Sequence, residues 1–185
     1  MLKLSDRKLK AFKVGKLFEI EKCKCSNASE LKHGNIPYVG ATNKNNGTMA
    51  FCGNLEKTTK GNCIVFVCDG QGSVGYSFYK HENFVGSTTL KVGRNQYINK
   101  YNALFITTAL DKNRIIYSFG YKRNEERLKN ETVFLPVDKD GNPDYDFMEQ
   151  FIKEREEKKR NEYIEYSKNK LSEIKSTIRE NLGGG

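Results

Sequence analysis

Residues 63–79 read CIVFVCDGQGSVGYSFY: an unbroken apolar run, a glycine-rich turn and a second run with aromatic side chains. The glycines of Gly70–Gly75 match the G-x-G-x-x-G pattern of dinucleotide-binding proteins, in which the turn opens a helix that receives the pyrophosphate. Tyr76–Tyr79 instead has the composition of a strand. The stretch therefore predicts a β-hairpin closed by a glycine turn, whose backbone N–H groups can still bind a phosphate.

Similar short apolar runs, separated by Gly, Asn and Ser, fill residues 1–95 and predict a mostly β domain. Asn46-Gly47 is a strong signal for a hairpin turn. The predicted strands are Phe12–Ile20, Ile36–Gly40, Thr48–Cys52, Cys63–Cys68, Gly75–Tyr79 and Thr88–Val92.

Helical spacing first appears in Lys100–Leu110, which predicts a short helix capped by Asn99. Arg123–Lys129 predicts one or two further helical turns. The segments on either side, Ile115–Tyr121 and Thr132–Val137, are predicted to be extended.

A long helix is predicted from Asn142, as N-cap, with Pro143 as its first residue, to Leu182. Such a helix is roughly 55–60 Å long, so part of it must project from the domain. We expect Phe147, Met148, Phe151 and Ile152 to pack on the domain. The fold class is therefore α+β, with a domain over residues 1–141, a helix over 142–182 and a tail over 183–185.

The projecting part of the helix carries an apolar stripe. Ile164, Leu171 and Ile178 are seven residues apart with Ile174 between them, which is the spacing of a short coiled-coil seam. A solvated helix stabilised by Glu–Lys pairs is the alternative. A stripe of Ile and Leu on a projecting helix, however, predicts a partner helix that covers it.

Composition favours a nucleic-acid partner and excludes several other classes. The net charge of +9 favours a polyanion. We find no signal peptide and no apolar run of the roughly 20 residues that a membrane span needs, so we expect a cytoplasmic protein without membrane contact. The odd number of cysteines predicts reduced thiols, and none has the paired spacing of a zinc site. These cysteines are Cys23, Cys25, Cys52, Cys63 and Cys68.

The sequence offers no convincing catalytic site. Pro143-Asp144 followed by Glu156-Glu157-Lys158 formally matches a nuclease pattern, but that site needs Glu and Lys on one face of a strand. In a helix, residues two apart point nearly opposite ways. The two histidines, His33 and His81, lie in polar stretches without a nucleophile partner. We therefore expect a chain that is not an enzyme.

Several loops carry amide, hydroxyl and basic side chains that could read bases. Asn and Gln bind adenine bidentately and Arg or Lys binds guanine. Thr42–Asn46 is the strongest candidate, and Lys57–Lys60, Lys80–Asn83 and Ser87–Thr89 follow. Ordinary solvent loops are the alternative for each. A domain that binds RNA or single-stranded DNA is another, since Tyr76, Phe78 and Tyr79 could stack on bases.

Five segments, in order, resemble the target-recognition domains of type I restriction–modification specificity subunits. They are Phe12–Ile20; Ile36–Asn43; Asp69–Gly75 followed by Phe78-Tyr79; Phe105–Leu110 before a Tyr-Ser-Phe-Gly sequence; and Leu128–Pro136 before the long helix. The resemblance covers essentially the whole chain.

The resemblance implies a DNA-recognition role. Family members join two recognition domains by long helices that pair antiparallel, and each domain reads half of a bipartite DNA site. The helices dock modification subunits that bind S-adenosylmethionine and methylate adenine, so no cofactor is expected on this chain. With one domain and one helix, it corresponds to half a specificity subunit. It is a natural half that forms a homodimer through Ile164–Ile178, the single-domain specificity chain of a type II system, or an excised recognition domain of a fused type II enzyme. A homodimer would read a symmetric site.

The resemblance carries over loops rather than base assignments, because base-reading residues vary with the target. For groove contacts we predict Thr42, Asn43, Lys44, Asn45, Asn46, Lys80, His81, Ser87, Thr88 and Thr89. For phosphate contacts we predict Lys57, Lys60, Gln71, Ser73, Lys122 and Arg123. For the partner helix we predict Ile164, Leu171, Ile174 and Ile178.

Overall fold

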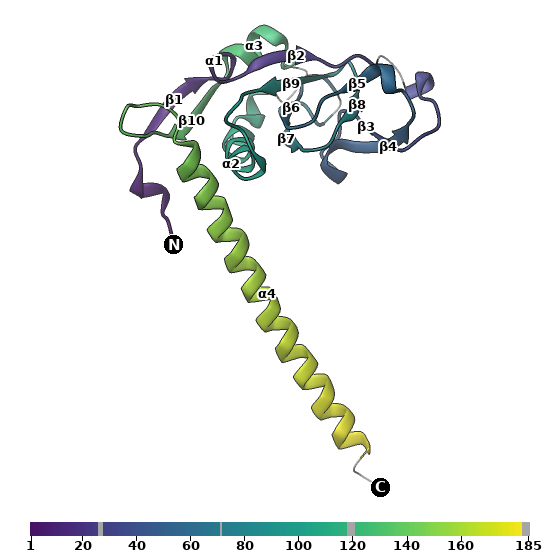
Figure 1. Cartoon of the computed structure of the whole chain (residues 1–185), viewed down its shortest axis with the longest axis vertical. Coiled ribbons are helices and arrows are strands. Elements are labelled where there is room, and N and C mark those ends of the chain that lie inside the picture. Colours follow the sequence, from purple (N-terminus) through teal and green to yellow (C-terminus); the bar gives the residue numbers. More distant parts are fainter. Residues whose placement is uncertain (26–27, 71, 118–120, 183–185) are drawn as a thin grey trace.

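The computed structural model describes residues 1–25, 28–70, 72–117 and 121–182, and confirms an α+β domain followed by a long helix (Figure 1). The helices are α1 (Val14–Leu17), α2 (Lys100–Asp111), α3 (Glu125–Asn130) and α4 (Tyr145–Leu182). The strands are β1 (Leu9–Lys13), β2 (Glu19–Lys22), β3 (Ile36–Val39), β4 (Thr48–Cys52), β5 (Thr58–Thr59), β6 (Cys63–Val67), β7 (Ser77–Lys80), β8 (Phe84–Gly86), β9 (Leu90–Arg94) and β10 (Thr132–Pro136).

Within the described ranges the strands form three sheets, with the orders β1-β10, β2-β9-β6-β7 and β4-β3-β8-β5. Strand β6 is the central element of the domain, since all five of its residues are buried. Ile64 and Phe66 face a core shared with α2, whereas Val65 and Val67 face a second core shared with Val39 of β3. This alternation places α2 on one face of the β2-β9-β6-β7 sheet and β3 and β8 on the other face.

The hairpin predicted from residues 63–79 is confirmed. Strands β6 and β7 pair antiparallel, with Cys63 opposite Lys80 and Phe66 opposite Ser77. A strand therefore follows the glycine turn, and the turn does not have the strand–helix context that dinucleotide binding requires. The predicted hairpin at Asn46-Gly47 is also confirmed, because β3 and β4 on either side of it pair antiparallel.

The prediction of a single strand over Phe12–Ile20 was wrong. One helical turn, α1, separates β1 from β2, and it buries Val14 and Leu17 on the same side. Residues three apart share a face in a helix and lie on opposite faces in a strand, so burying both requires the turn. The backbone N–H of Val14 donates to the carbonyl of Glu131 at 2.9 Å, which ties this turn to the end of α3.

The helical predictions after residue 99 are confirmed, with changed bounds. Asn99 caps α2 by accepting from the backbone N–H groups of Tyr101 and Asn102, and Asn124 caps α3 by accepting from Arg127. The extended prediction for Ile115–Tyr121 was wrong at its start, since Arg114–Tyr117 forms a 3-10 turn. Residues 118–120 lie outside the described residues.

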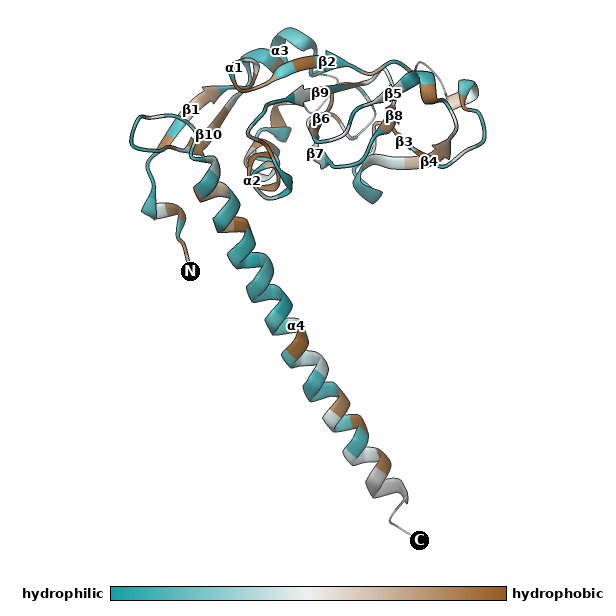
Figure 2. Cartoon of the chain, viewed as in Figure 1, coloured by the Kyte–Doolittle hydropathy of each residue, from teal (hydrophilic) through white to brown (hydrophobic). Residues whose placement is uncertain are grey.

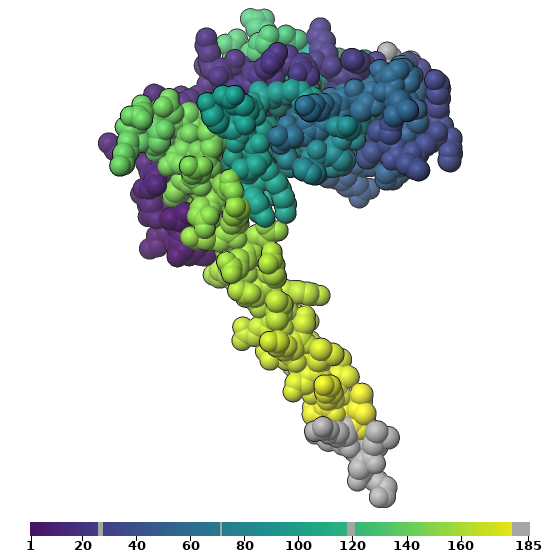
Figure 3. Space-filling model, viewed as in Figure 1, coloured from purple at the N-terminus to yellow at the C-terminus, as the bar shows by residue number. Residues whose placement is uncertain are grey.

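Helix α4 begins at Tyr145, and its cap is Asp144 rather than Asn142, since Asp144 Oδ1 accepts from the backbone N–H of Phe147 at 2.9 Å. Met148 and Phe147 are buried against the domain, as predicted. Phe151 packs edge-on against Phe105 of α2, with the two ring centres 5.3 Å apart. The 38 residues of α4 span about 57 Å. Its first turns lie against the domain, and the remainder stands clear of it (Figure 3). Among the described residues, no helix is long and apolar enough to span a membrane.

Candidate nucleic-acid interface

The predicted recognition loop, residues 42–46 (called the recognition loop below), joins β3 to β4 with its side chains directed outward. Asn43, Lys44, Asn45 and Asn46 are exposed and Thr42 is half-buried. Asn45 and Asn46 adopt left-handed backbone angles, with φ of 49° at each, which asparagine tolerates better than most residues. The Asn46 amide donates to the carbonyl of Tyr79 at 3.0 Å, so the end of the loop is attached to β7. The loop therefore presents amide and lysine side chains from a fixed backbone.

Gly47 sets the close approach of this loop to the sheet. Its φ is +78°, and a Cβ atom here would lie 2.3 Å from the Phe78 ring. We expect Gly47→Ala to lower the free energy of unfolding by roughly 2–4 kcal/mol, from backbone strain and overpacking together. Gly72→Ala is the matched control, because Gly72 has a φ of +74° with nothing within 4 Å. Urea unfolding of both variants should show the larger loss for Gly47→Ala, and equal losses would contradict this packing.

The glycine turn, residues 69–75, lies between β6 and β7. Gln71 lies outside the described residues, and Ser73 is only 8% exposed, so the prediction that the Ser73 side chain contacts phosphate was wrong. Lys122 is exposed as predicted, but its ammonium group contacts Asp69 at 2.6 Å. This contact lowers the pKa of the Asp69 carboxyl group. A phosphate near Lys122 would therefore compete with a carboxylate already in place.

Two residues distant in sequence from the recognition loop, Tyr76 and Arg114, lie beside it. The Asn43 amide donates to the Tyr76 hydroxyl at 2.9 Å, and the Arg114 guanidinium lies 3.5 Å from the centre of the Tyr76 ring. Sequence reasoning missed Arg114, although its place in the polar turn that follows α2 was a usable signal. The loop, the residue that follows the glycine turn and the turn after α2 thus meet in one set of contacts, the Asn43–Tyr76–Arg114 contact.

The second predicted groove region, Lys80–Thr89, is only partly available. Lys80 is 2% exposed, and its ammonium group contacts Thr48 Oγ1 at 2.9 Å and Glu82 Oε1 at 2.7 Å, so its prediction was wrong. Ser87 is buried, with its hydroxyl 2.5 Å from that of Thr89. A base cannot reach a side chain that the fold already encloses and pairs. His81 and Thr88 remain exposed and Thr89 is half-buried.

Of the remaining predicted phosphate contacts, Lys60 is exposed and Lys57 is half-buried. The ammonium group of Lys57 donates to Glu30, which raises the pKa of Lys57. Arg94 donates to the carbonyl of Lys60 at 2.7 Å, so the backbone of Lys60 is attached to β9 while its side chain is exposed.

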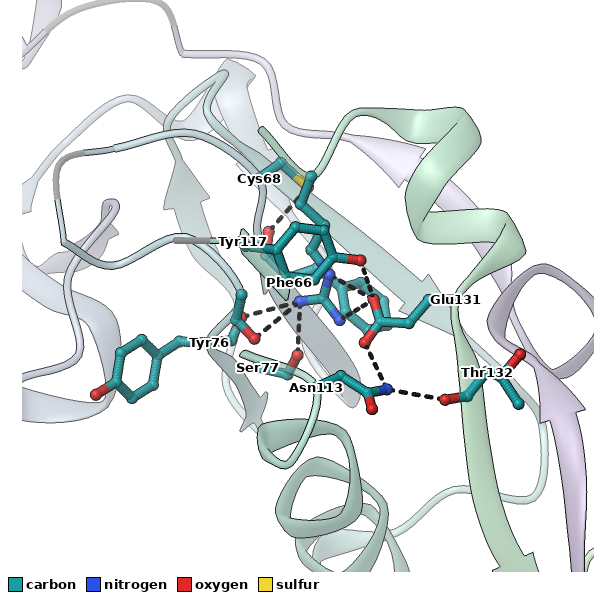
Figure 4. A network of polar contacts seen from close by, with 10 residues as sticks. Phe66, Cys68, Tyr76, Ser77, Asn113, Tyr117, Glu131 and Thr132 are labelled. Carbon is teal, nitrogen blue, oxygen red and sulfur yellow. Dashed lines mark hydrogen bonds and ion pairs between the residues drawn. The ribbon is translucent and has the colours of Figure 1, made fainter. Parts of the chain in front are cut away.

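Arg123 is fully buried, so its prediction as a phosphate contact was wrong. Its guanidinium lies against Glu131, with Nε 2.8 Å and Nη2 2.7 Å from Glu131 Oε2 (Figure 4). Its Nη1 donates to the carbonyls of Gly75 and Tyr76 and to Ser77 Oγ. A sequence cannot distinguish this arginine from its exposed neighbours, because the partner that removes it from solvent lies on another element.

Glu131 is shared by two more groups. The Tyr117 hydroxyl donates to Glu131 Oε2 at 2.8 Å, and the Asn113 amide donates to Oε1 at 3.2 Å. Burial, with Glu131 close by, raises the pKa of Tyr117. The buried pair therefore links the glycine turn, the turn after α2 and the start of β10.

The aromatic residues proposed for base stacking are not free platforms. Tyr79 is 8% exposed, Phe78 packs against Gly47, and one face of the Tyr76 ring is covered by Arg114. Stacking successive bases requires accessible ring faces. The surface is therefore poorly suited to single strands.

Two further sequence patterns acquire a structural role. Glu156 and Lys158 lie in α4, where Glu156 contacts Lys100 at 3.4 Å and Lys158 contacts Glu162 at 3.7 Å. All five cysteine side chains are buried. Within the described ranges, no group of three or more His, Cys, Asp or Glu residues is placed to hold a metal ion.

The predicted partner-helix residues lie on the projecting part of α4. Ile164, Leu171, Ile174 and Ile178 are 43%, 57%, 54% and 51% exposed. Apolar bands separated by polar turns are visible along the lower half of the helix in Figure 2. The stripe is thus solvent-facing in the single chain.

The family model described as the type I restriction modification DNA specificity domain matches residues 7–166. The chain belongs to this family. The chain is 34% identical over 157 residues to the type II restriction enzyme specificity subunit S.BcgI of Heyndrickxia coagulans, and the alignment covers 84% of this chain and 46% of the relative. The match confirms the resemblance to specificity subunits that the sequence suggested.

Solved structures show the same fold. The chain superposes on the S subunit of a type I restriction–modification system from M. genitalium with a TM-score of 0.60 at 19% identity, and the superposition covers 97% of this chain and 45% of that one. The HsdS subunit from Thermoanaerobacter tengcongensis gives a TM-score of 0.56 at 11% identity, covering 81% and 38%. The chain thus spans about half the length of these relatives or less.

Proposed function

We propose that the specificity domain recognises a double-stranded DNA sequence and carries no catalysis itself. The observation that carries this proposal is the exposed, backbone-anchored recognition loop, on a chain whose residues 7–166 match the DNA specificity family. Amide side chains on a rigid loop suit the donor and acceptor pattern of the major groove. The net charge of +9 supplies sequence-independent attraction to phosphate.

The proposed complex contains a second copy of the chain and a modification subunit. The apolar stripe on α4 needs a cover, and the chain spans about half the length of its relatives. A second copy, pairing antiparallel through Ile164–Ile178, would supply the missing half and give a symmetric bipartite site. The partner modification subunit would bind S-adenosylmethionine and methylate the DNA.

A competition assay tests DNA recognition directly. The full chain is bound to duplexes selected from a random pool, at a stated salt concentration, and challenged with random duplex and with single strands. One duplex sequence should win over both competitors. Equal competition by random duplex would exclude sequence-specific recognition, and a preference for single strands would favour the RNA or single-strand alternative.

The recognition loop should carry the discrimination. We expect Asn43→Ala combined with Asn45→Ala to lower the ratio of specific to nonspecific affinity by about tenfold or more, because each bidentate base contact is worth roughly 1–3 kcal/mol. Affinity for random duplex should change by less than about twofold, since no charge is removed. Asn130→Ala with Asn142→Ala, two exposed asparagines outside the loop, is the control. Equal losses on all sequences would mean that the loop contacts only the DNA backbone.

A further inference from the structure

The Asn43 amide is held in one orientation by a group that sequence reasoning did not connect to it. Its Nδ2 donates one hydrogen to the Tyr76 hydroxyl at 2.9 Å, across 33 positions of sequence. An amide has two N–H donors and a carbonyl oxygen with two lone pairs. The hydrogen bond to Tyr76 uses one N–H of this exposed residue, and among the described residues the other N–H and the oxygen have no partner.

The remaining N–H donor and oxygen acceptor of the amide complement the edge of one base. In the major groove, adenine presents N7 as an acceptor beside N6 as a donor, and an asparagine amide binds both at once. The other three bases do not offer this acceptor–donor pair. An amide that rotates freely loses conformational entropy when it binds, and an amide that is already oriented loses less.

Tyr76 is itself held by three contacts. Its carbonyl accepts from the backbone N–H of Val67 at 2.9 Å and from Arg123 Nη1 at 3.2 Å, and the Arg114 guanidinium covers its ring at 3.5 Å. Figure 4 shows the Tyr76 carbonyl turned toward the buried cluster while the ring points away from it. The Tyr76 side chain, which contacts the recognition loop, therefore belongs to a residue whose backbone is hydrogen-bonded to Arg123 of the Arg123–Glu131 pair.

We propose that Asn43 reads an adenine in the major groove and that Tyr76 is the positioning residue that orients its amide. The inference rests on the proposed function and deepens it by naming an A·T base pair as part of the target. Arg114, which holds the Tyr76 ring, completes the arrangement.

The test compares the full wild-type chain with Asn43→Ala and Tyr76→Phe, each selected on random duplexes. Tyr76→Phe keeps the ring under Arg114 and removes only the hydroxyl. Both variants should lose preference for adenine at the same position by about tenfold, and the double variant should lose little more, since the two groups act as one unit. Tyr97→Phe, which removes the hydroxyl of an exposed tyrosine that does not bond to Asn43, is the matched control and should keep the preference.

A second measurement changes the DNA and compares the wild-type chain with Asn43→Ala. Replacing that adenine by 7-deazaadenine removes the N7 acceptor and should weaken binding of the wild-type chain about tenfold while leaving Asn43→Ala unaffected, a readout that a general loss of structure would not reproduce.

The outcomes separate the two levels of the proposal. A wild-type chain that selects no sequence overturns the proposed function. A wild-type chain that selects a sequence, with Asn43→Ala keeping every preference or losing one for another base, overturns the adenine assignment alone. A Tyr76→Phe variant as selective as wild type overturns the positioning role.

Discussion

Leu171→Asp is expected to convert the chain from a dimer to a monomer. Leu171 lies midway between Ile164 and Ile178, seven residues from each, and is 57% exposed in the single chain. In an antiparallel pair centred on this stripe, Leu171 meets its own copy across the two-fold axis. Two aspartates would then face each other in an apolar seam, which combines charge repulsion with the cost of burying a charge. Light scattering should report half the wild-type mass.

Asn169→Asp is the matched control for this change. It adds the same charge to the same helix two residues away, where the side chain points nearly opposite to Leu171. Its mass should equal that of the wild-type dimer. A wild-type mass of one chain, or an unchanged mass for Leu171→Asp, would contradict the proposed assembly.

Affinity for DNA should depend on whether the chain is a dimer or a monomer. A dimer that engages both halves of a site gains roughly 10²–10⁴-fold in affinity over a single contact. The Leu171→Asp monomer should therefore bind a two-half-site duplex no better than a half-site, while its preference for the half-site sequence remains. Loss of that preference would mean that the helix contributes to base reading.

The direction of the pairing is tested by a cysteine at the same position. In an antiparallel dimer centred on Leu171, Leu171→Cys crosslinks to its own copy and Ile164→Cys does not, whereas a parallel dimer crosslinks both. The native cysteines do not compete, because all five are buried and burial raises the pKa of Cys23 to about 11 and of Cys63 to about 12.

Glu131→Gln is expected to cause the largest loss of stability of any single change considered. It leaves the guanidinium of Arg123, which is fully buried, without a counter-charge, and removal of one member of a buried pair costs about 3–5 kcal/mol. Tyr117 and Asn113 also lose a charged acceptor. The melting temperature should fall by roughly 10 °C, measured by calorimetry.

Glu125→Gln is the matched control, because it removes a paired carboxylate that is exposed rather than buried. Glu125 contacts Lys91 and Lys129 at 3.0 and 2.8 Å, but its side chain is 38% exposed. Exposed pairs contribute about 0–1 kcal/mol, so the melting temperature should hardly change. Replacing both Arg123 and Glu131 by apolar residues of similar volume should cost less than Glu131→Gln alone. Similar losses for Glu125→Gln and Glu131→Gln would contradict the role of burial.

The sequence by itself determined the elements whose signals are local. The hairpin of residues 63–79, the turn at Asn46-Gly47, the cap at Asn99, the long C-terminal helix and its apolar stripe all follow from patterns within a few turns of chain. Local pattern was insufficient over residues 12–20, where contacts with α3 and the core decide for a helical turn between two strands.

Only the tertiary structure decided which polar side chains are free. Arg123 and Lys80 look no different in sequence from exposed basic residues, yet the fold buries both. Arg123 lies against the carbonyls of Gly75 and Tyr76, and Lys80 lies against Thr48 of β4. The meeting of Asn43, Tyr76 and Arg114 likewise joins positions more than thirty residues apart. Exposure and pairing depend on which distant segments pack together, and composition and spacing do not record that.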